Sequence, residues 1–325
     1  MPIRRVGCHL DRVLFVGPLD RVLLLRSLPM LEGLSPMHLA AIAQHAQERF
    51  FAAGTTLQSA DDPNEAVYLI VEGEVEVRRQ GRPARRARPG EAVGFIETLS
   101  RSEQPLEVLA MTDTVTLEFD ADAQIDVCEE HFPVVMQYVG FLARSIASEL
   151  QRRAPASFEA IPLIAAQEYG DRINFVERVL VLSRSRAFST GCLDALCELA
   201  QHVVETSWDD GDRIWSIDEP AESFYLLVSG SVTCRAPSEN VFTSHPGRAI
   251  GIYETLFRGD RWNDARSRGR SVALRIDVEP FIDILEDHSD LALDFMALLA
   301  TDLIALQDAA VTTQTLNGPS TPPTL

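Results

Sequence analysis

The chain of 325 residues contains no lysine: all 29 of its basic residues are arginine, and 48 residues are acidic. The absence of lysine indicates a GC-rich genome and therefore a bacterial source. The formal net charge of −19 argues against nucleic acid as the main partner, because phosphate binding requires a basic face. It leaves room for a local basic patch.

The sequence also lacks the patterns of membrane, metal and catalytic sites. No run of 18 apolar residues and no signal-peptide core occur, so we expect a cytoplasmic protein without a membrane span. The five cysteines form no Cys-x-x-Cys motif, which is typical of free thiols in a reducing compartment. The seven histidines are scattered without metal-ligand spacing, and no catalytic motif appears. We therefore expect neither a metal, nor a cofactor, nor an enzyme.

One stretch of the chain occurs twice. Residues 89–99 and 246–256 share the opening Pro-Gly, the second glycine and the closing Glu-Thr-Leu, at an offset of 157 residues. The same offset relates further matches from Arg21 to His131 without an insertion. A period of this length indicates a duplicated globular domain rather than a solenoid. We predict a leader (1–17), domain 1 (18–150), a linker (151–171), domain 2 (172–310) and a disordered, proline-containing tail (311–325).

The hydrophobic pattern predicts a mainly β fold with helices at both ends of each copy. Helical spacing covers residues 18–48 and 121–150, and in the second copy it ends near Leu306. Between these helices, short apolar runs are broken by Gly, Asp and Pro, which is typical of a sandwich or barrel. These runs are 48–51, 55–58, 66–71, 73–79 and, as further strands, 107–119.

The motifs resemble those of the cyclic-nucleotide-binding domain. They are Leu31-x-Gly33-Leu34-Ser35, Phe51-x-x-Gly54, Tyr68-Leu69-Ile70-Val71-x-Gly73 and Pro89-Gly90-Glu91-x-x-Gly94, with counterparts in the second copy. The resemblance implies two tandem β-barrels of the double-stranded β-helix, or jelly-roll, type. The tandem layout is similar to the regulatory subunit of cAMP-dependent protein kinase. Because only 15 residues follow Ala310, we expect no helix-turn-helix of the catabolite activator type.

In that family a glutamate of the phosphate-binding cassette binds the ribose 2′-hydroxyl, and an arginine binds the cyclic phosphate. Phe95 and Ile252 stand at the glutamate position, and Gln104 and Arg261 at the arginine position. We predict degenerate cassettes, with cyclic-nucleotide binding lost in domain 1 and possible in domain 2 through Arg261. The candidate pocket residues are Gly94, Phe95, Ile96, Glu97, Thr98, Gln104, Gly251, Ile252, Tyr253, Glu254, Thr255 and Arg261.

Six arginines form a basic hairpin in the first copy: Arg78, Arg79, Arg82, Arg85, Arg86 and Arg88. The hairpin is either a solvated tip or a docking patch for an acidic partner. A second arginine-rich region, 258–270, is either an anion site or a solvated loop. The helices around Tyr138–Leu150 and Leu291–Leu306 are surfaces for a dimer or a protein partner, or caps of their own barrels.

Three functions follow from these observations. The first is a non-enzymatic regulatory or scaffold protein that acts through a protein partner or a homodimer. The second is a sensor of a cyclic nucleotide or another anion, bound mainly in domain 2. The third and most remote is a cupin-like metalloenzyme.

Overall fold

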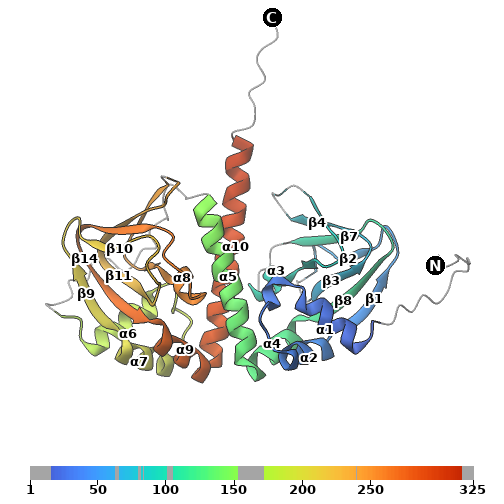
Figure 1. Cartoon of the computed structure of the whole chain (residues 1–325), viewed down its shortest axis with the longest axis horizontal. Helices are drawn as coiled ribbons and strands as arrows, with labels where there is room; N and C mark the ends of the chain where they lie inside the picture. Colours follow the sequence, from blue (N-terminus) through green and yellow to red (C-terminus); the bar gives the residue numbers. More distant parts are fainter. Residues whose placement is uncertain are drawn as a thin grey trace, which may run out of the picture.

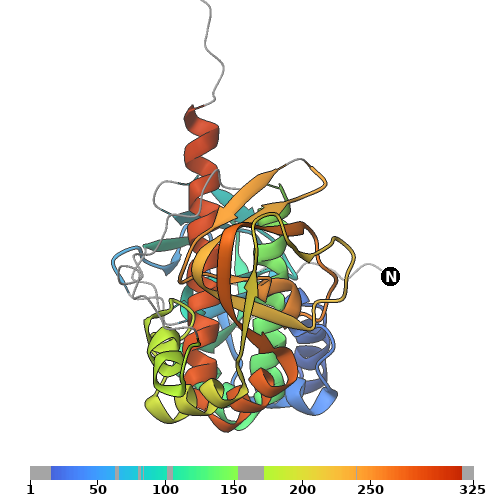
Figure 2. The same cartoon turned by 90° about the vertical axis from the view of Figure 1, so that its left-hand side faces the viewer.

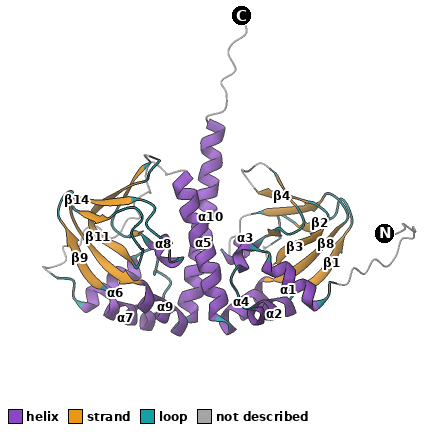
Figure 3. Cartoon of the chain, in the orientation of Figure 1, coloured by secondary structure: helices purple, strands orange, loops and turns teal. Residues whose placement is uncertain are grey.

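The computed structural model describes residues 16–62, 66–79, 82, 84–100, 105–152, 172–238 and 240–316. It contains two domains of the same architecture on either side of a central pair of helices (Figure 1). Each domain carries its sheets on the outside and its helices toward the centre and at one end (Figure 3). Of the predicted boundaries, most of the leader and most of the linker lie outside the described residues.

Domain 1 begins with helices and ends with helices. Ser35 caps the second helix by accepting a hydrogen bond from the His38 N–H, and Pro36 follows at the first helical position. Its elements are α1 (Pro18–Arg26), η1 (Pro29–Leu31), α2 (Pro36–Gln44), β1 (Gln47–Phe51), β2 (Thr56–Gln58), β3 (Ala66–Glu72), β4 (Val75–Arg79), β5 (Arg85–Ala87), β6 (Ala92–Val93), α3 (Phe95–Leu99), β7 (Leu106–Ala110), β8 (Thr114–Asp120), α4 (Ala121–Glu130) and α5 (Phe132–Arg152).

Domain 2 repeats this order after the linker. Asn174 and Glu177 form a reciprocal capping box at its first helix. Its elements are α6 (Phe175–Arg184), α7 (Leu193–His202), β9 (Val204–Trp208), β10 (Arg213–Trp215), β11 (Ser223–Arg235), β12 (Val241–Ser244), β13 (Ala249–Ile250), α8 (Ile252–Leu256), β14 (Asp264–Asp277), α9 (Val278–Asp287) and α10 (Ser289–Leu316).

The sheets have the predicted jelly-roll-like arrangement, and the described strands do not close into a barrel. Domain 1 has two antiparallel four-stranded sheets, in the orders β1-β8-β3-β6 and β2-β7-β4-β5. In domain 2 the long strands β11 and β14 run through both halves, so that six strands are joined in one sheet. A small apolar core that includes Ile70, Val75 and Val108 fills the space between the two sheets of domain 1.

Two predicted helix limits were wrong. The helix predicted over 121–150 is broken at His131, where α4 ends, and α5 starts just before Pro133, which has no N–H to donate. The break recurs at His288, where Asp290 replaces the proline, so the packing of the turn contributes as well. The last helix does not end near Leu306 but continues to Leu316, into the predicted disordered tail, whose remaining residues lie outside the described part.

Helices α5 and α10 cross the middle of the molecule side by side, as Figures 1 and 2 both show. Each also packs on the small helix of the opposite domain: α5 on α8, and α10 on α3. Buried side chains of both domains, such as Leu142 and Leu299, belong to one continuous apolar core. The surfaces predicted to hold a dimer partner are therefore used, in large part, within one chain.

Candidate functional site

Each repeated Gly-x-x-x-Gly turn ends in a glycine that starts a short helix. Gly94 has a φ of +88°, and a Cβ there would lie 2.7 Å from the Ala66 carbonyl oxygen. Gly251, with a φ of +72°, holds the same place before α8. The hydroxyls of Thr98 and Thr255 donate to the carbonyls of these glycines at 2.7 and 2.6 Å. The two turns therefore have the same geometry, and the side chains around them distinguish the domains.

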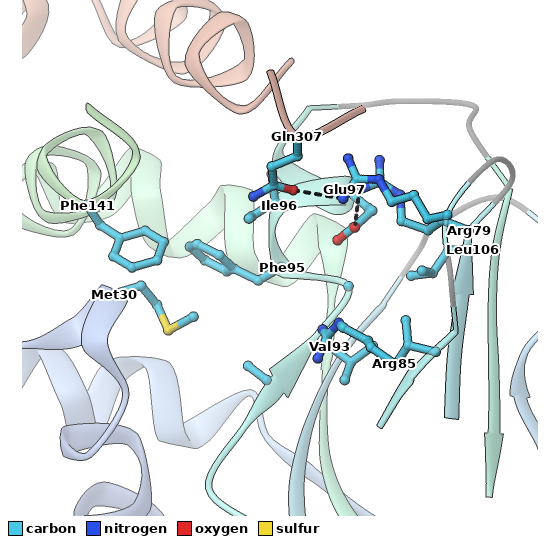
Figure 4. Close-up of a pocket in the computed structure, with 14 residues that line it drawn as sticks. Met30, Arg79, Arg85, Val93, Phe95, Ile96, Glu97, Leu106, Phe141 and Gln307 are labelled. Atoms are coloured by element: carbon cyan, nitrogen blue, oxygen red, sulfur yellow. Dashed lines mark hydrogen bonds and ion pairs between the residues drawn. The ribbon is translucent and has the colours of Figure 1, made fainter. Parts of the chain in front are cut away.

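Domain 1 has a cavity of about 390 Å³ against this turn. One end is apolar and is formed by Met30, Phe95 and Phe141, whereas Arg79 and Arg85 lie at the other end (Figure 4). Phe95 is held by edge-on contacts with Tyr138 and Phe141, with ring centroids 4.9 and 6.0 Å apart. The remaining lining residues include Val77, Arg82, Val93, Ile96, Glu97, Leu106 and Gln307.

The hairpin β4–β5 sorts the six predicted docking arginines into two sets. Val77 pairs with Arg85, and Glu76 pairs with Arg86. Because successive side chains of a strand point to opposite faces of the sheet, Arg85 lies on the same face as the buried Val77, and Arg86 lies on the other face. Arg79, Arg82 and Arg85 line the cavity. Arg78, Arg86 and Arg88 lie on the outer face, in ion pairs with Glu74, Glu76 and Glu107. The six arginines of the hairpin are thus divided between the cavity and the outer surface.

Arg79 and Glu97 form the charged pair at the cavity wall. Their side chains are 3.3 Å apart and largely buried, with 9% and 13% exposed. Burial lowers the pKa of the Arg79 guanidinium, and the Glu97 carboxylate opposes this shift while the neighbouring Arg82 and Arg85 reinforce it. Within the part of the chain that the structure describes, Arg85 has no carboxylate partner. The cavity wall thus carries more positive charge than it neutralises.

Arg82 connects this wall to the last helix of domain 2. Its guanidinium donates to the Gln307 side chain at 3.0 Å and to the Ile304 carbonyl at 3.1 Å, and it pairs with Asp308 at 2.5 Å. Gln307 itself lines the cavity. Its counterpart in the repeat, Leu150 on α5, lines the cavity of domain 2. Each domain therefore receives one pocket residue from the closing helix of the other.

The corresponding cavity in domain 2 measures only about 50 Å³. Arg261, the predicted phosphate ligand, is 4% exposed and is used internally. It donates to the carbonyls of Gly251, at 2.8 Å, and Ser223, and it pairs with the buried Glu254 at 3.2 Å. Its guanidinium also lies 4.4 Å from the centre of the Trp215 ring.

Aromatic rings fill the rest of that space. Trp215 stacks on Tyr225, and Phe242 stacks on Trp262, with centroid distances of 5.9 and 5.6 Å. Tyr253, another predicted pocket residue, also lines the small cavity, and burial raises the pKa of its hydroxyl. Ile252, the preceding residue, is buried. In domain 2, therefore, the space equivalent to the domain 1 pocket is largely occupied by the domain's own side chains.

The duplication shows which positions differ between the two pockets. In the sequence, Arg79, Arg82 and Arg85 correspond to Ala236, Glu239 and Phe242. Conversely, Gln104, which lies outside the described residues, corresponds to Arg261. The inward arginines of the hairpin were missed as pocket residues. Strict strand alternation on either side of the turn, combined with the 157-residue alignment, would have identified them.

Among the described residues, no group of three or more His, Cys, Asp and Glu side chains is placed to hold a metal ion. Across the same ranges, none of the helices is both long enough and apolar enough to cross a membrane.

The fold and the two turns define a pair of ligand-binding domains of one class. A family model described as the cyclic nucleotide-binding domain matches residues 48–131 and 205–288, together more than half of the chain. The chain belongs to this family.

Several known proteins are similar to parts of the chain. The Pycsar effector protein XpPycTIR of Xanthomonas perforans is 29% identical over 189 residues, which are 55% of this chain and 56% of that protein. The cyclic AMP receptor protein of Thermus thermophilus is 23% identical over 152 residues, which are 45% and 67% of the two chains. The regulatory subunit of a cAMP-independent protein kinase A from Trypanosoma brucei is 15% identical, with a TM-score of 0.33 and coverage of 93% of this chain and 90% of that one. The chain spans about half the length of the Xanthomonas protein.

Proposed function

We propose that this chain is a non-enzymatic regulatory protein that binds a nucleotide-sized anion, a cyclic nucleotide in the first instance, in domain 1. The observation that carries the proposal is the contrast between two equivalent pockets. The pocket of domain 1 is open, about 390 Å³, and lined by three arginines, whereas that of domain 2 is about 50 Å³. A cavity of several hundred Å³ suits a small-molecule ligand.

Domain 2 then has a structural role, and the predicted loss of the pocket applies to it. Arg261 already has a carboxylate and two carbonyl partners, so an incoming phosphate would have to replace them. The sequence favours domain 2 as the site of a sensor, whereas this geometry favours domain 1. The cytoplasmic location and the absence of catalysis remain part of the proposal.

The output of the sensor is a protein partner. The Arg82 contacts with α10 link the wall of the domain 1 pocket to the end of a helix that projects beyond both sheets (Figure 2). A ligand that shifts the hairpin therefore changes the surroundings of that helix end. Partner binding would be coupled to ligand binding by the same free energy in both directions.

The test is a thermal-shift panel with the four common 3′,5′-cyclic mononucleotides on the whole chain. A ligand at 100 times its Kd adds about 2.7 kcal/mol of stability, which corresponds to roughly 5–10 °C at about 2–4 °C per kcal/mol. Two variants assign the domain: Arg85→Phe copies the residue of domain 2 into domain 1, and Arg248→Gln removes an arginine that lines the pocket of domain 2. We expect Arg85→Phe to abolish the shift and Arg248→Gln to retain it.

If Arg248→Gln abolished the thermal shift and Arg85→Phe retained it, the ligand would bind in domain 2. Absence of a shift with all four nucleotides would leave the scaffold hypothesis, in which neither pocket binds one.

A further inference from the structure

We infer that domain 1 binds its ligand in the opposite sense to its family, with the anionic group on the β4–β5 hairpin and the base near the small helix α3. The inference rests on the proposed function and specifies how the same site is used. In the family pattern, the phosphate lies against the small helix, between the cassette glutamate and arginine. Both of those residues are replaced here, by Phe95 and Gln104.

The charge of the pocket lies on its hairpin wall. Arg79, Arg82 and Arg85 come from β4, the turn and β5, and all three line the cavity. Arg79 and Arg85 lie at the end away from Met30 and Phe141 (Figure 4). Glu97 of α3 neutralises Arg79, and Asp308 of α10 neutralises Arg82. Arg85 remains for an anion, since no carboxylate of the described residues pairs with it. Charge-assisted contacts from a guanidinium are the strongest that a phosphate can receive in such a site.

The small-helix end of the cavity has the opposite character. The acidic residue in the first turn of α3, Glu97, does not belong to this end, because its carboxylate pairs with Arg79 of the hairpin. The wall at this end is formed by Phe95, Phe141 and Met30, and it is apolar with two aromatic rings. Aromatic rings and a thioether are suitable contacts for the face of a nucleobase.

The second copy supports the assignment of both ends. The apolar wall of domain 1 corresponds to Ala187, Ile252 and Leu298 in domain 2, where neither ring is present. The arginine wall corresponds to Ala236, Glu239 and Phe242. The rings of the apolar wall and the arginines of the hairpin are thus found together in domain 1, and both sets are replaced at the equivalent positions of domain 2, whose pocket is filled by other side chains such as Trp215 and Arg261. A ligand with one aromatic end and one anionic end accounts for both.

A thermodynamic cycle on the whole chain tests this orientation. The probes are the tightest-binding of the four cyclic nucleotides and its nucleoside, which lacks the phosphate, and the readout is the ratio of their Kd values. The variants are Arg85→Gln and the matched control Arg86→Gln, which removes the adjacent arginine on the outer face of the same strand.

We expect the nucleotide to bind wild-type protein about 10- to 100-fold more tightly than the nucleoside, as the loss of one charge-assisted contact implies. In Arg85→Gln the ratio should fall toward one while the Kd of the nucleoside stays within about twofold. Arg86→Gln should keep the wild-type ratio.

Two results would overturn the orientation while leaving the proposed function intact. An unchanged ratio in Arg85→Gln would place the phosphate elsewhere. An equal loss for nucleotide and nucleoside would show that Arg85 contacts the base or the ribose. Failure of all four nucleotides to bind wild-type protein would instead overturn the proposed function, and the orientation with it.

Discussion

The buried pair of Arg261 and Glu254 gives the sharpest test of the role of domain 2. Their side chains are 4% and 2% exposed and 3.2 Å apart. Arg261→Met keeps the length and apolar stem of the side chain but removes the charge and every donor. The Glu254 carboxylate and the carbonyls of Gly251 and Ser223 would then lose a partner in a closed space.

The expected destabilisation is large. Removing one partner of a buried ion pair costs about 3–5 kcal/mol, because the other charge stays buried without compensation. For a chain of this size each kcal/mol lowers the melting temperature by about 2–4 °C, so we expect a fall of roughly 6–20 °C. The double variant Arg261→Met/Glu254→Gln should recover part of this loss, since the uncompensated charge is gone.

Calorimetry of the ligand-free chain measures these melting temperatures. Arg275→Met serves as the control, because Arg275 pairs with Asp277 on the surface, where an ion pair is worth about 0–1 kcal/mol. If Arg261→Met melted within about 2 °C of wild type and lost its response to cyclic nucleotides, Arg261 would be a ligand-binding residue. Domain 2 would then be the sensor, and the structural role assigned to it here would be wrong.

Two further predictions use matched positions within the chain. Gly94 and Gly90 both have φ near +88°, but of these two only Gly94 has a backbone atom in the way of a Cβ, the Ala66 oxygen at 2.7 Å. In urea unfolding, Gly94→Ala should therefore lose roughly 1–3 kcal/mol more stability than Gly90→Ala. Equal losses in the two variants would contradict the close contact at Gly94. Burial raises the pKa of the Cys128 thiol from 9.0 to about 12, so the folded protein holds this proton more tightly than the unfolded chain does. The contribution of the protonated thiol to the free energy of unfolding is therefore fully present below pH 9, and it declines as the pH rises toward 12. At pH 8, iodoacetamide labelling mapped by mass spectrometry should modify the exposed Cys192 and spare Cys128, and similar rates at the two sites would refute this.

The duplication and the fold class could be predicted from the sequence because both depend on local, repeated patterns. Ser35-Pro36 predicts a helix start, and the continuous run Tyr68–Val71 predicts a buried strand; both are confirmed in α2 and β3. The break at His131 was missed because residues on both sides have the same helical spacing. The joining of six strands in domain 2 depends on the long-range register of β11 with β14, which no local pattern contains.

The pockets were harder to predict because their residues come from separate elements. Comparison with the family cassette draws attention to Gln104 and Arg261, which follow the small helices in the sequence, and not to the hairpin. Whether Arg261 faces a ligand or Glu254 is decided by side-chain packing around Trp215. The entry of Gln307 into the domain 1 pocket depends on how α10 crosses α5, which follows from the assembled core of both domains.

The two domains neutralise the glutamate of the small helix with arginines from different elements, and this difference explains why one pocket is open. Both keep a glutamate in the first turn of the small helix, and both neutralise it with an arginine. In domain 1 that arginine, Arg79, comes from β4 at the outer wall, so the cation approaches from the side and leaves the cavity free. In domain 2, Arg261 comes from the loop after α8, extends beneath Gly251 and stacks on Trp215, so the same charge pair fills the space that a ligand would take. The origin of one guanidinium thus distinguishes an open cavity of about 390 Å³ in domain 1 from a filled one of about 50 Å³ in domain 2.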